Sequence, residues 1–242
     1  MNLLLLGDDD FLADGTVRLT GRRALHAQEV LKACAGDTRR VGRLNGLVGR
    51  GEVLSHTRDE LRLRVELTLP PPPRPGLDLL LALPRPKALK KVLPAVASLG
   101  VDRLFLVNAA RVEKSYFDSK VLAKDSVDEL FGLGLEQARD TVPPKLLLKD
   151  RFRPFVEDEL DALLGSAATR LVAHPGEHPK PGSPAGRVAL AIGPEGGWVP
   201  FELELLAARG FVPFSLGDRI LRVEVAVPYA LGMLKAPSAG RC

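Results

Sequence analysis

The sequence predicts an α/β protein in which a small β-barrel precedes a larger domain built on a parallel sheet. Residues 1–70 carry short apolar or alternating runs separated by turn residues, a pattern typical of a small barrel. Residues 71–76 follow as a stiff, proline-rich linker. Residues 77–242 then alternate near-continuous apolar strands with helical patterns, which indicates a largely parallel sheet that is covered on both faces.

The first domain contains several runs with strand patterning, and the last of them alternates strictly between apolar and charged residues. The predicted strands are residues 16–20, 38–44, 47–54 and 61–67. Turn chemistry separates them at Gly36-Asp37, Asn45-Gly46 and residues 49–51. Residues 26–35 are the one convincing helix here.

Positive charge is concentrated in this domain. The cations are Arg18, Arg22, Arg23, Lys32, Arg39, Arg40 and Arg43, and only Glu29 and Asp37 oppose them over the same span. A basic surface on a small barrel favours contacts with RNA phosphates, and we assign Arg18, Arg22, Arg23, Arg39 and Arg40 to RNA binding. The alternative is a solvated face laced with salt bridges.

The second domain reads as a regular alternation of strands and helices. The predicted strands are residues 77–83, 101–107, 145–148, 169–173, 188–192 and 211–216, and the predicted helices are residues 87–99, 119–139, 155–164 and 223–234. Pro94 should kink the first helix or start a second one. Another helix opens after Val199, with Phe201, Leu205 and Ala208 on its apolar face and Gly210 as its stop.

The stretch most suggestive of a ligand site is residues 188–198, an apolar strand that runs into a Gly-Pro-Glu-Gly-Gly turn. In open α/β sheets, ligands bind outside the carboxyl end of a strand, and glycines let a ligand approach bare backbone. The turn has neither phosphate-binding glycine pattern, and Glu195 would repel a phosphate, so the ligand should be neutral or cationic where it touches this turn. The alternative is a tight connection that needs its glycines for geometry alone.

Composition excludes several classes of protein. The chain has 242 residues, 45% hydrophobic and 26% charged, with a formal net charge of +4 that suggests an anionic partner. No stretch is apolar enough for a membrane span, and the leucines at positions 3–6 lack a basic flank, so we expect a cytoplasmic protein with no membrane partner. His174 and His178 have the spacing of half a zinc site, but we expect no metal.

Three segments near the C-terminus carry a family resemblance when taken together. They are residues 173–177 (Ala-His-Pro-Gly-Glu), 192–197 (Ile-Gly-Pro-Glu-Gly-Gly) and 215–222 (Ser-Leu-Gly-Asp-Arg-Ile-Leu-Arg), and each follows an apolar strand. This order closely resembles the RsmE family of small-subunit ribosomal RNA methyltransferases, within the knotted SPOUT class. His26 with residues 30–32 and Gly36-Asp37 resembles the family signature in a PUA-like barrel, so the resemblance covers nearly the whole chain.

The resemblance implies S-adenosylmethionine bound in a trefoil knot, a homodimer, and methylation of the N3 of a uridine in 16S rRNA, either naked or within an assembled small subunit. It implies that the three loops hold the cofactor through Ala173, His174, Ile192, Gly193, Pro194, Glu195, Gly197, Ser215, Leu216, Gly217, Ile220 and Leu221. Of these, Ile192, Leu216, Ile220 and Leu221 would wall the adenine pocket. Glu195 would lie near the methyl donor or cap the following helix, and Trp198 has no assigned role.

Arg222 is the residue most suited to touch the target uridine, with Glu224 to orient it and Arg139 contributing from the other side as an RNA contact. The chain departs from the family at Val225, where a threonine is expected, and at Ala97-Ser98. Two alternatives remain: an RNA-binding ribosome-assembly factor with a vestigial methyltransferase domain, and a SPOUT methyltransferase that acts on another RNA.

Overall fold

The computed structural model describes residues 3–29, 34–165, 168–182, 184 and 186–234. The chain divides into two compact units: Met1–Pro73 with Gly132–Pro143, and Arg74–Phe131 with Pro144–Cys242. Residues 132–143, which the sequence pattern assigned to the second domain, therefore cluster with the first. Among the described residues, no helix is both long and apolar enough to span a membrane.

The first unit is built on a five-stranded sheet with the order β1-β3-β4-β5-β2. Its strands are β1 (Leu4–Leu6), β2 (Thr16–Thr20), β3 (Thr38–Arg43), β4 (Val48–His56) and β5 (Glu60–Leu69). β1 pairs parallel with β3, and the other pairings are antiparallel. β1 was not predicted, because a short run of leucines without alternation has no distinctive strand pattern.

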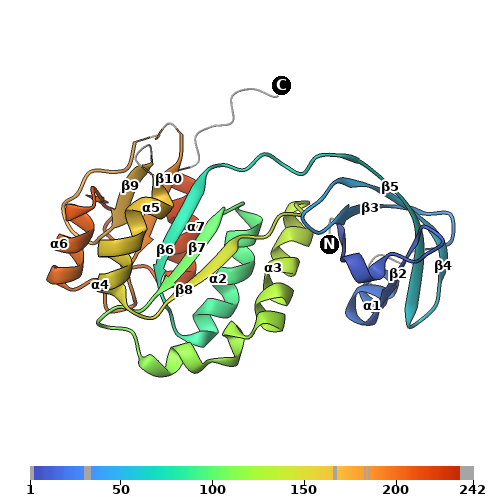
Figure 1. Ribbon diagram of the computed structural model, residues 1–242, viewed down its shortest axis with the longest axis horizontal. Helices are drawn as coiled ribbons and strands as arrows, with labels where there is room; N and C mark the ends of the chain where they lie inside the picture. The colour runs from blue at the N-terminus through green and yellow to red at the C-terminus, as the bar shows by residue number, and fades with distance from the viewer. Residues whose placement is uncertain (1–2, 30–33, 166–167, 183, 185, 235–242) are drawn as a thin grey trace. The chain divides into compact units, whose positions relative to one another are not determined.

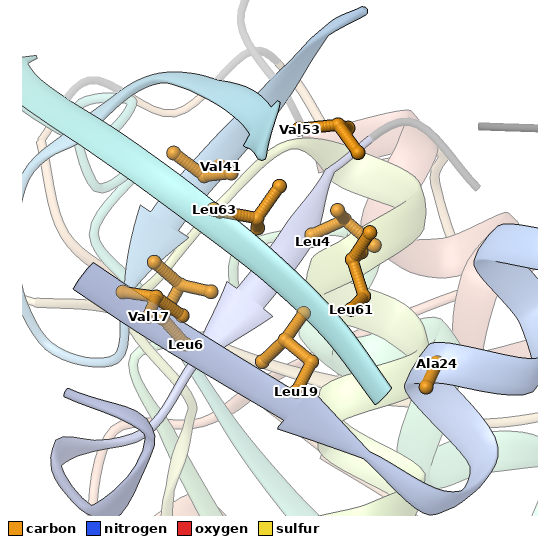
Figure 2. Close-up of a cluster of buried hydrophobic side chains, with 9 residues drawn as sticks. All are labelled: Leu4, Leu6, Val17, Leu19, Ala24, Val41, Val53, Leu61 and Leu63. Atoms are coloured by element: carbon orange, nitrogen blue, oxygen red, sulfur yellow. The ribbon is translucent and has the colours of Figure 1, made fainter. Parts of the chain in front are cut away.

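The core of this unit joins the two edges of the sheet. Figure 2 shows the side chains of β1 and β2 in one cluster with those of the central strands. Leu6 from one edge and Val17 and Leu19 from the other are all fully buried in that cluster. A sheet whose two edge strands share one core curls around that core.

The helix of this unit begins earlier than predicted. α1 covers Gly21–Glu29, whereas residues 26–35 were expected to be helical. Residues 30–33 of that prediction lie outside the described part of the chain, and Ala35 is in a turn. Ala24 ties the first turn of α1 to the domain, because its side chain is fully buried in the core cluster.

Residues 132–143 are tied to the first unit by polar contacts. Thr141 is fully buried; its hydroxyl donates to the carbonyl of Gly46 at 2.6 Å, and its own carbonyl accepts from the amide of Asn45 at 2.8 Å. The buried carboxylate of Glu136 accepts from Arg22 at 3.3 Å. Burial raises the pKa of Glu136, and Arg22 partly opposes that effect. The C-terminal half of α3 (Lys124–Ala138) thus belongs to the first unit.

The second unit contains a six-stranded, entirely parallel sheet in the order β11-β9-β10-β6-β7-β8. The strands are β6 (Leu77–Ala82), β7 (Arg103–Val107), β8 (Lys145–Lys149), β9 (Thr169–Ala173), β10 (Val188–Ile192) and β11 (Val212–Phe214). Every residue of β6 and β10 is buried, so helices must cover both faces of these strands, as predicted.

The helices of this unit form two packed groups (Figure 1). α2 (Pro86–Ser98) packs against α7 (Val223–Leu234), which also contacts β10. α6 (Pro200–Ala208) packs against the segment made of α4 (Phe152–Pro154), a π-helical turn (Phe155–Glu159) and α5 (Leu160–Leu164). Pro94 stands inside α2 without ending it.

The apolar face predicted for α6 is wrong. Phe201 is 50% exposed and lies 5.9 Å from the guanidinium of Arg153, whereas Glu202 and Leu206 are the buried residues of the helix. The reason is that the Glu202 carboxylate accepts hydrogen bonds from backbone amides, which lets a charged residue replace an aromatic one in the interior.

The strand order places the three motif segments at one edge. β6, β7 and β8 follow one another outward, and the chain then crosses to the other side of β6 to form β9, β10 and β11. Ala173, the last residue of β9, is in register with Ile192, the last of β10, and with Phe214, the last of β11. All three segments therefore leave the sheet at the same level, beside the point where the strand order reverses.

Near the amino end of β6, the carboxylate of Asp78 is 1% exposed and accepts hydrogen bonds from Arg103 and Arg187. We expect Asp78→Ala to lower the free energy of unfolding by about 3 kcal/mol, because it leaves two arginines without their buried partner. Urea unfolding measures this. Asp128→Ala, which removes an exposed pair with Lys124, should cost at most about 0.5 kcal/mol, and equal losses for the two variants would contradict the assignment.

Candidate functional site

A cavity of about 590 Å³ lies where the three loops leave β9, β10 and β11. Every residue that the resemblance assigned to the cofactor lines it. The lining is Ala173, His174, Pro175, Gly176, Glu177, His178, Lys180, Ile192, Gly193, Pro194, Glu195, Gly197, Trp198, Ser215, Leu216, Gly217, Asp218, Arg219, Ile220, Leu221, Val223 and Ala226. Its volume is within the range of small-molecule sites.

The loop after β10 is a tight turn around a tryptophan. The amide of Gly197 donates to the carbonyl of Pro194 at 2.8 Å, and Gly197 has a φ of +76°, which disfavours other residues. A Cβ on Gly193 would lie 3.1 Å from both the backbone nitrogen and Cδ1 of Trp198. A side chain at Gly193 would therefore displace Trp198 from the cavity wall.

Glu202 holds this loop in place from the first turn of α6. Its carboxylate accepts from the amide of Val199 at 3.0 Å, at the start of its own helix, and from the amide of Ala110 at 2.7 Å, in the loop after β7. Beside it, Arg111 donates to the carbonyl of Gly196. Of the two roles considered for Glu195, capping of this helix belongs instead to Glu202. The signal was present, because Pro200 followed by a glutamate two residues later fits a helix start.

Glu195 itself remains accessible at the cavity. Its side chain is 42% exposed, and its carboxylate oxygen lies 3.8 Å from Nε of Arg85. That distance is too long for a strong ion pair in water, so Glu195 presents negative charge to the cavity. This carboxylate would attract a cationic group of a ligand in the cavity.

The loop after β11 is shaped by Ser215 and Gly217. The Ser215 hydroxyl accepts from the amide of Gly217 at 3.1 Å, and Gly217 has a φ of +106° with open space where a Cβ would be. Leu216 and Leu221 are partly buried in the wall. Ile220 also lines the cavity but is 94% exposed, so it stands at the rim.

The loop after β9 presents two histidines. The rings of His174 and His178 lie 5.6 Å apart, and the amide of His174 donates to the carbonyl of Phe214 at 3.1 Å. Burial, followed by electrostatic repulsion from His178, lowers the pKa of His174. The described residues contain no group of three or more His, Cys, Asp or Glu side chains placed to hold a metal.

Arg222 and Glu224 stand beside the cavity rather than among its lining residues. Arg222 is exposed between the lining residues Leu221 and Val223, and its carbonyl accepts from the amides of Val225 and Ala226 at the start of α7. Glu224 does not orient Arg222; it lies 3.5 Å from Nζ of Lys91 on α2. A hydrogen bond from its own backbone amide lowers the pKa of Glu224, and Lys91 lowers it further.

The arginines assigned to RNA divide into two groups. Arg23 donates to both oxygens of Asp10 at 2.6 and 2.7 Å, Arg22 pairs with Glu136, and Arg39 pairs with Asp37 at 2.7 Å. These are structural contacts, and two of their acceptors lie outside the span whose charges were compared. Arg18 and Arg40 are exposed and have no ion pair among the described residues, and Arg139 is an exposed residue with a φ of +62° directly after α3.

We expect Glu202→Ala to lower the free energy of unfolding by about 2–3 kcal/mol, because the amides of Val199 and Ala110 lose their buried acceptor. Denaturant unfolding of the ligand-free chain measures this. Glu204→Ala, an exposed change on the same helix, should stay within about 0.5 kcal/mol of the unmodified chain. A Glu202→Ala variant as stable as the Glu204→Ala variant would show that the carboxylate does not anchor the loop.

Comparison with known proteins places the chain in a family. Residues 71–235 match the family model described as an RNA methyltransferase domain. The chain is 30% identical to the ribosomal RNA small subunit methyltransferase E of Treponema pallidum (strain Nichols) over 98% of this chain and 91% of that protein. It is also 30% identical to the protein of the same name from Synechocystis over 93% of this chain and 74% of that protein.

Solved structures share the fold. A putative methyltransferase from Legionella pneumophila with bound SAM has a TM-score of 0.76 and 21% identity, covering 96% of this chain and 95% of that one. A ribosomal RNA small subunit methyltransferase E from Neisseria gonorrhoeae bound to S-adenosyl methionine has a TM-score of 0.73 and 21% identity, again over 96% and 95%. On the family model and the relative from Treponema pallidum, this chain belongs to the ribosomal RNA small subunit methyltransferase E family of RNA methyltransferases.

Proposed function

We propose that the protein methylates the N3 of a specific uridine in 16S rRNA, with S-adenosylmethionine as the methyl donor. The observation that carries the proposal is that three loops from separate parts of the chain converge on one cavity at the carboxyl edge of the sheet. The family of the chain and the S-adenosylmethionine bound in two structural neighbours support it. A ribosomal RNA substrate supports a cytoplasmic location for the protein.

The residues at the cavity fit this cofactor. The cavity offers backbone groups at glycines for a nucleoside, apolar walls at Ile192 and Leu216, and the Glu195 carboxylate for a cationic centre. When bound, the cofactor supplies an electrophilic methyl group on a positively charged sulfur. Lys180 and Arg219 also line the cavity and can balance a carboxylate on the ligand.

We also propose that the second unit forms the trefoil knot of the SPOUT class and that the first unit is a PUA-like barrel. β11 is an edge strand, and the loop after it leads into α7. α7 packs on α2 and on β10, which is the second strand inward from β11 in the sheet. A chain that returns in this way passes over the ends of β9 and β10, and this supports the trefoil knot of the SPOUT class. The curled five-stranded sheet of the first unit supports a PUA-like barrel that binds RNA.

The chemistry requires a group that stabilises a deprotonated base. The N3 of uridine is a poor nucleophile while it keeps its proton, and its negative charge spreads onto the flanking carbonyl oxygens once the proton leaves. A guanidinium is always charged and presents two parallel donors to adjacent acceptors. Arg222 is exposed beside the cavity and its side chain has no ion pair among the described residues, so it is available for this role.

Mapping methylated nucleotides in 16S rRNA, from cells with and without the protein, tests the function directly. The proposal requires one N3-methyluridine that disappears with the protein and returns when it is supplied again. A methylated position lost from another RNA would identify a different substrate. Unchanged methylation in every RNA would favour an assembly factor with a vestigial domain, a reading that Val225 in place of the expected threonine also favours.

We expect Arg222→Ala to keep the affinity for S-adenosylmethionine but to slow single-turnover methylation about 10²-fold, equivalent to about 3 kcal/mol of transition-state stabilisation. Arg222→Lys should recover little, because an ammonium lacks the planar fork. Rapid-quench assays with saturating rRNA measure the rate, and calorimetry measures the affinity. Methylation by Arg222→Ala at the unmodified rate would make Arg222 a binding or structural residue.

The first unit yields a prediction about salt. Arg18→Ala and Arg40→Ala should each reduce the slope of log affinity against log salt by about 1, because each removes one phosphate contact. Filter binding of a 16S rRNA fragment over a salt series measures the slope. Arg153→Ala, which makes the same charge change at an exposed pair with Glu157 in the second unit, is the control and should leave it unchanged. An unchanged slope in the Arg18 and Arg40 variants would show that these residues do not contact RNA phosphates.

We also propose that the protein is a homodimer through α7. The inner face of this helix packs on α2 and β10, while Val225 and Tyr229, four residues apart, stay 48% and 49% exposed. Light scattering should give twice the mass of one 26.1 kDa chain, and Tyr229→Glu should shift the mass toward a monomer. A monomer mass for the unmodified chain over a wide concentration range would contradict this proposal.

A further inference from the structure

The indole of Trp198 is a polar group in the cavity wall to which the proposed function gives no role. Trp198 is the single tryptophan of the chain, it lines the cavity, and it is 4% exposed. Its Nε1 is buried and has no hydrogen-bond partner in the described part of the chain. A buried indole N–H normally finds an acceptor, so this one calls for an explanation.

The indole packs between an aromatic ring and the backbone of Gly193. The ring of Phe152 packs against it with 5.4 Å between ring centroids and an interplanar angle of 43°. Its pyrrole edge lies at Gly193, because a Cβ there would be 3.1 Å from Cδ1 and 3.2 Å from Nε1. Gly193 itself lines the cavity. The N–H therefore lies beside the bare backbone of Gly193, at the wall of the cavity.

We propose that Trp198 donates its Nε1–H to an acceptor atom of the bound adenosyl cofactor. This inference rests on the proposed function, since it concerns the ligand of the same cavity. An indole N–H is a donor only, so it cannot bind the sulfonium or the methyl group. Its partner must be a carboxylate oxygen, a ribose oxygen or an adenine ring nitrogen, all of which are unchanged by the reaction.

This chemistry predicts which step Trp198 affects. A contact with a part of the cofactor that does not react is equally strong before, during and after methyl transfer. Loss of the N–H should therefore weaken S-adenosylmethionine and S-adenosylhomocysteine to the same extent, and should leave the rate at saturating cofactor unchanged. If the indole only filled space, Trp198→Phe would keep both affinities.

The test uses the full chain labelled with ¹⁵N. A single tryptophan gives a single indole N–H resonance, and Trp198→Phe identifies it by its disappearance. Titration with S-adenosylhomocysteine should move the indole proton downfield, as a new hydrogen bond does. By calorimetry, Trp198→Phe should bind S-adenosylmethionine and S-adenosylhomocysteine about tenfold more weakly. Phe201→Leu, an exposed change on α6 outside the cavity lining, is the control and should bind both ligands normally.

The outcomes separate this inference from the proposed function. If the unmodified chain binds the cofactor while the indole proton stays in place, the inference is overturned and the function stands. Equal affinity of Trp198→Phe and the unmodified chain would have the same meaning. If the unmodified chain binds neither ligand at millimolar concentration, the proposed function fails, and the inference fails with it. The resonance shift is measured on the unmodified chain, so it does not depend on how well the variant folds.

Discussion

The shared register of β9, β10 and β11 is the constraint on which the site depends. Because Ala173 is paired with Ile192 on one side and with Phe214 on the other, three parallel strands end in one row. Parallel strands cannot be joined by tight turns, so the loops that follow them come from distant parts of the chain. The register turns these separate segments into the walls of one cavity. Glu202 then fixes the second loop by accepting from the amides of Val199 and Ala110.

Much of the second unit could be predicted from the sequence, because its strands are short apolar runs bounded by breakers. The expected ranges for β9, β10 and α7 agree with the structure, and the comparisons confirm the family that the three motifs indicated. The orientation of α6 was wrong for a physical reason. Apolar periodicity favoured Phe201 as a buried residue, but hydrogen bonds from two backbone amides stabilise Glu202 in the interior instead. Sequence periodicity carries no information about such tertiary partners.

The arginines of the first unit illustrate the same limit for charge. Counting charges along one stretch left Arg22 and Arg23 without carboxylates, yet folding brings Glu136 and Asp10 to them. The acceptor for Arg22 lies more than a hundred positions away. Arg18 on β2 and Arg40 on β3 are exposed and have no ion pair among the described residues. A run of cations in a sequence thus overstates the positive charge of the folded surface. Only the contacts in the fold distinguish the paired arginines from the unpaired ones.

Residues 132–143 have a consequence for how the chain can be divided. They leave the second unit in the middle of α3, complete the first unit through Glu136 and Thr141, and return before β8. The two units are therefore connected at three places along the chain and not at one linker. A truncation after the proline-rich linker, residues 71–76, would separate Glu136 from Arg22 and Thr141 from Gly46. Neither unit can be exchanged with a single cut in the chain, so each is better altered by point substitution.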